Sequence, residues 1–182
     1  MKHKIFIYLS FFLAVILFAC KKDNSAVLQN EIQTEEQTTA NTNAAGATQI
    51  SGVGFFATPA ECDAAGQGAV YAIRMTGDLE GCLYAFIDDF ECSPSGTYRE
   101  VGREYFVGTY NGQPGTFRTT YKFEAKYEDC DGGPLGAEIF GRCQHPIVEG
   151  SGTGVFNGVS GQLNFKDDIE AGNFPYRGRL QF

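Results

Sequence analysis

The chain is 182 residues long and carries 22 acidic against 14 basic side chains, which gives a formal net charge of −8. A surface of this sign repels phosphate backbones, so we expect no nucleic-acid partner. The length allows one domain of ordinary size in addition to a leader or tether.

The first twenty residues have the pattern of an export signal. The basic stretch Lys2 to Lys4 precedes an apolar run from Ile5 to Phe18, which is shorter than the ~20 residues that cross a bilayer. The run ends in Leu17-Phe18-Ala19-Cys20, which resembles the lipobox of bacterial lipoproteins. This resemblance implies that residues 1–19 are a removable signal peptide and that Cys20 is lipidated. An ordinary secretory signal with an incidental Cys20 is the alternative.

The residue after the lipobox bears on the location of the protein. In bacterial lipoproteins, Asp directly after the lipidated cysteine is typical of retention in the inner membrane, whereas here Lys21 follows. The resemblance therefore implies a lipid anchor at Cys20 in the outer membrane, on its periplasmic or its cell-surface side. Several acyl chains hold a protein firmly, because each buried methylene contributes ~0.8 kcal/mol.

Residues 20–50 differ in composition from the rest of the chain. They are rich in Asn, Thr, Gln, Ala and Glu and contain no aromatic residue. Such a segment cannot bury enough apolar surface to offset its ordering entropy. We therefore predict a flexible tether over residues 20–50 and a folded domain over residues 51–182.

The folded domain shows the two-residue alternation of β-strands. Between Phe117 and Tyr127, aromatic residues fall on one parity and charged residues or threonines on the other, which indicates one buried and one wet face. Near the C-terminus, aromatic and apolar residues likewise alternate with Arg177 and Arg179, which we place on the outer face. Further strands are predicted at Val70–Met75, Leu79–Ile87, Thr97–Thr109, Ala137–Cys143, Gly152–Phe156 and Gln162–Phe165.

Turn signals separate these segments. Asn111-Gly112 and Asn157-Gly158 supply the positive φ angles of tight hairpins. Short, regularly spaced strands without a convincing helix predict an all-β, antiparallel eight-stranded barrel, with a β-sandwich as the alternative. Closure into a barrel also removes the exposed edges that promote aggregation.

The glycine-rich C-terminal third carries a family resemblance. The run Gly152-Thr153-Gly154-Val155-Phe156-Asn157-Gly158-Val159-Ser160-Gly161, followed by Tyr176-Arg177-Gly178-Arg179-Leu180-Gln181-Phe182, resembles the closing hairpins of allene oxide cyclase and dirigent-like barrels. Gly77-Asp78-Leu79-Glu80-Gly81 is similar to an early strand motif of bacterial members. The likeness covers roughly residues 70–182 and implies an eight-stranded barrel with an apolar interior.

This resemblance does not identify a reaction. Cyclases of the family act on an unsaturated fatty-acid epoxide inside the barrel, and dirigent proteins steer the coupling of phenoxy radicals. No catalytic position of either maps onto this chain. The glycines are also poor candidates for a phosphate-binding loop, because the stretch runs into a strand pattern and has no basic residue before Lys166. We therefore assign Gly152, Gly154, Phe156, Gly158 and Gly161 to barrel closure.

Five cysteines remain beyond Cys20, and in an exported protein such residues usually pair. We predict disulfides between Cys82 and Cys92 and between Cys130 and Cys143, because each pair flanks a short segment, and we leave Cys62 unpaired. Zinc is disfavoured, since the chain has no Cys-x-x-Cys pair.

Acidic residues cluster in three places: Asp88-Asp89 with Glu91, Glu128-Asp129 with Asp131, and Asp167-Asp168 with Glu170. We interpret them as solvated charges at strand ends. Calcium binding and a pair of catalytic carboxyl groups for glycoside cleavage are the alternatives.

The mature chain has one histidine, His145, which we interpret as a loop residue because Pro146 follows it. A general base needs an orienting partner and a nucleophile. An unpaired Cys62 is the one candidate nucleophile, and no motif supports that couple.

These observations give one leading hypothesis: an envelope lipoprotein whose barrel binds a small apolar ligand in its lumen or a partner at its surface. A cyclase- or isomerase-type enzyme in the same lumen and a structural or adhesive module are the alternatives. We favour a non-enzymatic role and assign no catalytic residue, metal or cofactor, and the oligomeric state stays open. Convergent polar groups deep in the lumen would favour an enzyme. A lumen filled with Phe and Tyr side chains would favour a structural barrel.

Overall fold

The computed structural model describes residues 46–130 and 135–182. The predicted signal peptide, Cys20 and most of the predicted tether lie outside the described residues, as does Asp131 of the second acidic cluster. In the described ranges, no helix has the length and apolar character needed to cross a membrane.

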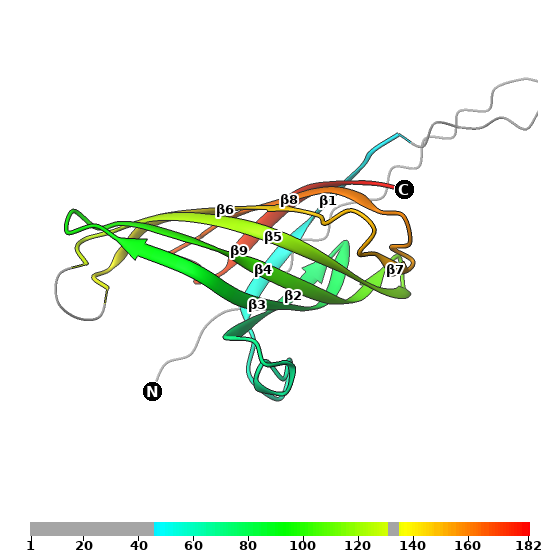
Figure 1. Cartoon of the computed structure of the whole chain (residues 1–182), viewed down its shortest axis with the longest axis horizontal. Helices are drawn as coiled ribbons and strands as arrows, with labels where there is room; N and C mark the ends of the chain where they lie inside the picture. Colours follow the sequence, from blue (N-terminus) through cyan, green and yellow to red (C-terminus); the bar gives the residue numbers. More distant parts are fainter. Residues whose placement is uncertain (1–45, 131–134) are drawn as a thin grey trace, which may run out of the picture. The chain divides into compact units, whose positions relative to one another are not determined.

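The domain is an antiparallel eight-stranded β-barrel with one short additional strand (Figure 1). The barrel strands follow the spatial order β4-β3-β2-β1-β9-β8-β6-β5, and pairing between β4 and β5 closes the ring. The elements are β1 (Thr48–Phe56), the 3-10 turn η1 (Ala65–Gln67), β2 (Tyr71–Gly77), β3 (Leu79–Cys92), β4 (Thr97–Tyr110), β5 (Gln113–Tyr127), β6 (Glu138–Pro146), β7 (Thr153–Gly154), β8 (Ser160–Lys166) and β9 (Phe174–Gln181). The predicted barrel is therefore confirmed.

The first strand was not predicted. β1 begins at Thr48, so the last residues assigned to the tether belong to the barrel. β1 pairs with β2 on one side and β9 on the other, and its Ile50 is buried in the core. The alternation of this strand is obscured because Gly52 and Gly54 occupy its inward face after Ile50, so few apolar side chains mark that face.

A cluster of aromatic side chains closes one part of the lumen. Phe106, Phe117 and Phe156 are fully buried, with ring centroids 4.8 to 5.7 Å apart. We call these three residues the aromatic plug. Phe106 and Phe117 come from β4 and β5, where they are direct cross-strand partners, and Phe156 is inserted from the loop after β7.

The predicted strand Gly152–Phe156 is mostly a turn. Only Thr153 and Gly154 pair, with Thr116 and Gly115 of β5. Gly154 has a φ of 60°, a conformation that favours glycine. The chain then turns back through a hydrogen bond from Phe156 N to Thr153 O of 3.1 Å. The glycines thus allow the chain to bring Phe156 into the barrel.

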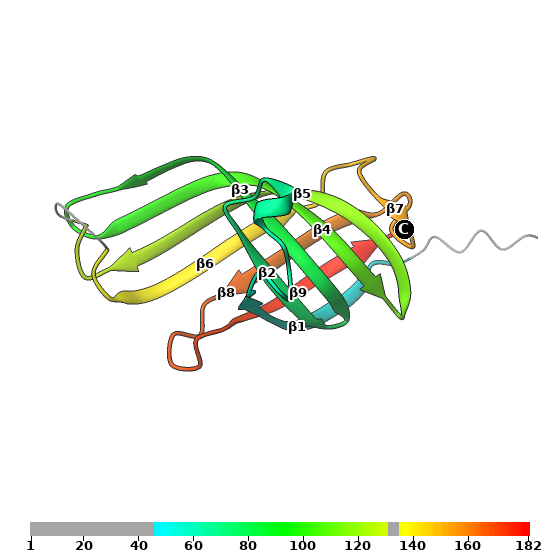
Figure 2. The same ribbon diagram turned by 90° about the horizontal axis from the view of Figure 1, so that it is seen from below.

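Strands β3, β4 and β5 are 14 or 15 residues long and project, with the start of β6, beyond the other strands (Figure 2). A register shift between Ile87 and Asp89 marks the start of this extension on β3, as expected for a β-bulge. A disulfide joins Cys92, at the end of β3, to Cys130, which follows β5. It fastens the outer end of the extension.

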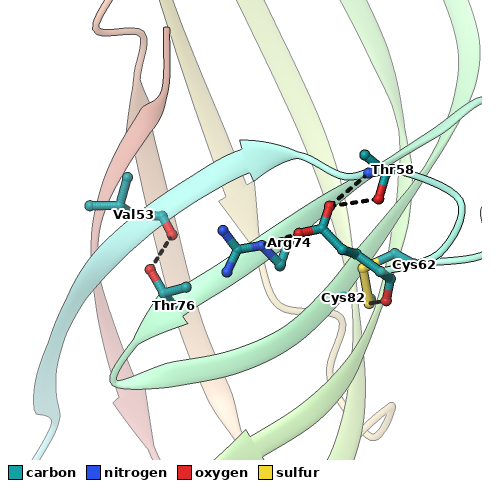
Figure 3. Close-up of polar contacts among 7 residues, drawn as sticks. Val53, Thr58, Cys62, Arg74, Thr76 and Cys82 are labelled. Atoms are coloured by element: carbon teal, nitrogen blue, oxygen red, sulfur yellow. Dashed lines mark hydrogen bonds and ion pairs between the residues drawn. A yellow bond between two sulfur atoms is a disulfide. The ribbon is translucent and has the colours of Figure 1, made fainter. Parts of the chain in front are cut away.

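The connection from β1 to β2 is held to the outside of the barrel (Figure 3). Cys62 in this connection forms a disulfide with Cys82 of β3. Beside it, Glu61 accepts hydrogen bonds of 2.9 Å from the backbone and the hydroxyl of Thr58 and pairs with Arg74 at 3.0 Å. The Thr58 hydrogen bonds, and secondarily the Arg74 charge, lower the pKa of Glu61.

Both predicted disulfide pairings are wrong. Cys82 and Cys92 lie ten residues apart on the same strand, which places them about 30 Å apart at ~3.3 Å per residue. A disulfide requires Cα atoms within about 7 Å, and the Cα atoms of both observed pairs are 5.9 Å apart. Cys143 faces the lumen from β6, out of reach of Cys130, and among the described residues it keeps a buried free thiol.

Candidate ligand-binding cavity

The lumen between the aromatic plug and the extension contains a cavity of about 330 Å³. All eight barrel strands contribute side chains to the lining, and the cavity walls are mainly aromatic and aliphatic. The lining residues are Phe56, Tyr71, Ile73, Leu83, Tyr98, Glu100, Glu104, Tyr121, Phe123, Tyr127, Leu135, Glu138, Cys143, His145, Phe165, Asp167 and Phe174. This size and composition are typical of a small-molecule site.

Glu100 lies on the inward face of β4 and is only 7% exposed. Its carboxylate accepts a hydrogen bond of 2.5 Å from the Tyr98 hydroxyl and one of 2.7 Å from the Tyr121 hydroxyl. Burial, and then these hydrogen bonds to Glu100, raise the pKa of both tyrosines. Both phenols therefore stay neutral and act as donors to the carboxylate.

Glu104 lies four residues further along β4, on the same face, and is 4% exposed. Its Oε2 atom accepts a hydrogen bond of 2.6 Å from the Thr119 hydroxyl and contacts Nδ1 of His145 at 2.5 Å. Since Oε2 is an acceptor, this contact assigns the proton to Nδ1. The other ring nitrogen, Nε2, is buried and has no hydrogen-bond partner among the described residues.

A second pair of carboxyl groups lies where β6 and the end of β8 meet. The side chains of Glu138 and Asp167 both fill the space beside the Cα of Gly141, where a Cβ would collide with them. The backbone N–H of Asp167 donates to Gly141 O at 3.0 Å. Burial, followed by the hydrogen bond and charge of Glu138, raises the pKa of Asp167 to about 7. A proton on Asp167 supplies the donor that the buried Oε1 of Glu138 otherwise lacks.

The other titratable groups of the lining are shifted toward their neutral forms. Burial, then the charges of Glu100 and Glu104, raise the pKa of Tyr71. Burial, then the charges of Glu138 and Asp167, raise the pKa of Tyr127 to about 12. The Cys143 thiol also has a raised pKa, chiefly because it is buried. A thiol of this kind is a poor nucleophile.

The interpretation of His145 as a loop residue is wrong. His145 lies in β6, opposite Leu163 of β8, and is 4% exposed. Pro146 is tolerated because it occupies the last position of the strand. The hypothetical couple between Cys62 and His145 is also excluded, because Cys62 is disulfide-bonded outside the barrel wall.

The acidic clusters divide between the two sides of the barrel. Asp88 and Glu91 are solvated and pair with arginines on β4, as the interpretation of these clusters predicted. Asp167 is the exception, because it turns into the lumen. Arg177 and Arg179 are exposed on the outer face of β9, as predicted.

Glu100 and Glu104 are the main residues that the sequence analysis missed, although the sequence contains a signal for them. Both share the parity of Tyr98 and Phe106 within the predicted strand Thr97–Thr109. Two acidic residues on the aromatic face of a strand indicate a polar site inside a barrel. The aromatic face of β4 is interrupted by Glu100, Gly102 and Glu104, whereas β5 and β9 keep a more regular alternation.

Comparison with protein-family models and with curated proteins finds no match for this chain. Within residues 46–130 and 135–182, no three His, Cys, Asp or Glu side chains are arranged to hold a metal ion.

Proposed function

We propose that this protein is a lipid-anchored envelope protein whose barrel, of the allene oxide cyclase and dirigent-like type that its glycine motifs resemble, binds a small, largely apolar molecule in the lumen. The observation that carries the proposal is the cavity of about 330 Å³, with Glu100, Glu104 and His145 buried in its wall. Burying polar groups costs free energy unless they are satisfied. A ligand that bonds to His145 Nε2 removes one such cost.

The same observation counts against a purely structural barrel. A lumen that serves only stability is filled by apolar side chains, as the aromatic plug fills its own part. Here the lumen instead holds two buried glutamates and a buried histidine. We infer that these residues are kept for contact with a ligand.

The test uses naphthylmethanol, a neutral apolar probe, and isothermal titration calorimetry. We expect the wild-type domain to bind the probe and the variant Ile73→Trp, which fills the lumen, to lose binding. Val107→Trp places the same side chain on the outer face of β4, where Val107 is exposed, and is expected to bind like the wild type. Absence of binding in the wild type, or equal binding by Ile73→Trp, would contradict the proposal.

A cyclase- or isomerase-type enzyme in the same lumen is the second candidate. It is favoured by the contact between Glu104 and His145 Nδ1, which orients the ring and leaves Nε2 without a hydrogen-bond partner among the described residues. This is the arrangement of an oriented general base. Nε2 would take a proton from a C–H bond of the bound molecule and return it at another atom, so that the product is an isomer of the substrate.

The enzyme candidate is tested by incubating an extract of envelope small molecules with the protein in heavy water. Mass spectrometry should detect deuterium on carbon in the presence of the wild type and none with His145→Gln. Glu149→Gln, a change of an exposed residue, serves as the control. If the wild type causes no incorporation, the enzyme candidate fails and the binding function is unaffected.

The anchoring part of the proposal depends on Cys20 and is tested separately. Metabolic labelling of the full chain with a palmitate analogue should give a labelled protein, and Cys20→Ala should abolish the label. Persistent labelling of the variant would contradict lipidation at this position.

A further inference from the structure

We infer that the ligand of the lumen is a cation: an amine or quaternary ammonium group attached to an apolar body. This inference rests on the proposed binding function and names the chemical class of the ligand. It comes from the charges that line the cavity and from the side chains that surround them.

Four carboxyl groups line the cavity, from Glu100, Glu104, Glu138 and Asp167, and none of its described lining residues is lysine or arginine. This contrasts with the outer face of the same strands. There Asp88 pairs with Arg103 at 2.8 Å, Glu91 with Arg99 at 3.1 Å, and Glu124 with Arg142 at 3.2 Å. These outer acids thus have arginine partners, whereas the acids that line the cavity have none among the described residues.

The hydrogen bonds to Glu100 do not replace that missing positive charge. Glu100 is bonded by two tyrosine hydroxyls, and Glu104 by the hydroxyl of Thr119 and by His145. The hydroxyl donors are neutral, and His145 is the one basic side chain in the described lining. A buried carboxylate without an opposite charge is costly. At Glu100, whose described partners are both neutral, a cationic ligand would supply the missing positive charge.

The walls around the carboxyl groups also suit a cation. Tyr98 lies with Phe123 and Tyr127 in an edge-to-face cluster, with ring centroids 6.0 and 5.8 Å apart. Aromatic faces attract ammonium groups, and the attraction is stronger in a desolvated site. Carboxylates beside aromatic rings combine both forms of recognition. An anionic molecule of the same shape would instead be repelled by the carboxylates.

The experiment compares three probes that share a naphthyl ring: naphthylmethylamine, naphthylmethanol and naphthoate, which are cationic, neutral and anionic near neutral pH. We expect the amine to bind at least about tenfold more tightly than the alcohol, and naphthoate to bind most weakly. If the alcohol or naphthoate binds as tightly as the amine, the inference is wrong and the proposed binding function stands. If none of the three binds, the proposed function itself fails.

Variants locate the charge preference within the lumen. Glu100→Gln keeps the shape of the side chain and removes its charge, so the affinity for the amine should fall while the affinity for the alcohol is retained. Glu124→Gln removes an outer carboxylate of β5 and should change neither affinity. Equal loss of amine affinity in Glu124→Gln would mean that the amine responds to the overall charge of the protein, which would overturn the inference. The alcohol reports whether each variant is folded.

Discussion

Replacing Asp167 by asparagine should stabilise the barrel, and the gain should depend on pH. The Asp167 carboxyl lies beside Glu138 at Gly141, and its pKa is raised from 3.8 to about 7. Below pH 4 the group is protonated in both the folded and the unfolded protein and costs nothing. As the pH rises from about 4 to about 7, the unfolded chain releases this proton and the folded protein retains it. Stability therefore falls over this interval and stays constant above it.

The size of the effect follows from the shift. A difference of about three pKa units corresponds to about 4 kcal/mol. The Asp167 side chain is only partly buried, so water screens the interaction and we expect about 1 to 2 kcal/mol at pH 8. At pH 5 the gain should be about two fifths as large, because the pH has then passed through only the first part of the interval in which the unfolded chain alone releases the proton.

Urea unfolding of the wild type and Asp167→Asn at pH 5 and pH 8 measures the gain in the free energy of unfolding at each pH. The other titrating groups are the same in both proteins, so their contributions cancel in the comparison. Glu138→Gln removes the partner charge and leaves Asp167 buried, so it should give a pH dependence of the same sign and smaller size. Glu149→Gln, which is exposed, should give none. An equal effect of Asp167→Asn at both pH values, or a larger gain at pH 5, would refute the reasoning.

Three further changes test other parts of the fold. Cys92→Ser combined with Cys130→Ser opens a link between residues 38 positions apart and should lower the free energy of unfolding by about 4 kcal/mol in urea without reductant; an unchanged value would contradict this disulfide. Phe156→Ala removes a fully buried ring of the aromatic plug and should cost about 3 to 5 kcal/mol by the same assay, whereas a cost below about 1 kcal/mol would show that the plug is unimportant. The Cys143 thiol is buried with a raised pKa, so it should react with a thiol reagent in urea and resist it in the native protein; rapid native labelling would be inconsistent with its place in the lumen.

The sequence predicts the barrel well because its strands alternate strictly. On β5, Phe117, Tyr121 and Tyr127 share one face in the structure as they do in the pattern. Turn residues such as Asn111 and Gly112 mark the hairpin between β4 and β5. Alternation and turn residues therefore predict those features of the fold that depend on a single strand and the turn next to it.

The contacts of the candidate site could not be predicted from single strands, because they join residues of different strands. The contact between Glu104 and His145 joins β4 to β6, 41 residues apart, and the disulfides depend on which face of each strand a cysteine occupies. Pro146 also suggested a loop at His145, although a proline at the end of a strand leaves the preceding residue free to pair. Alternation along β4 would have placed Glu100 and Glu104 in the lumen, whereas their partners required the closed ring.

The most direct test of the account is to observe a probe inside the lumen. Nuclear Overhauser effects between naphthylmethylamine and a methyl-labelled domain would report which side chains the probe contacts. We predict effects to the methyl groups of Ile73 and Leu83, which line the cavity, and none to Val101 or Val107 on the outer face. Effects confined to the outer valines, or none at all at saturating probe, would contradict a ligand-binding lumen.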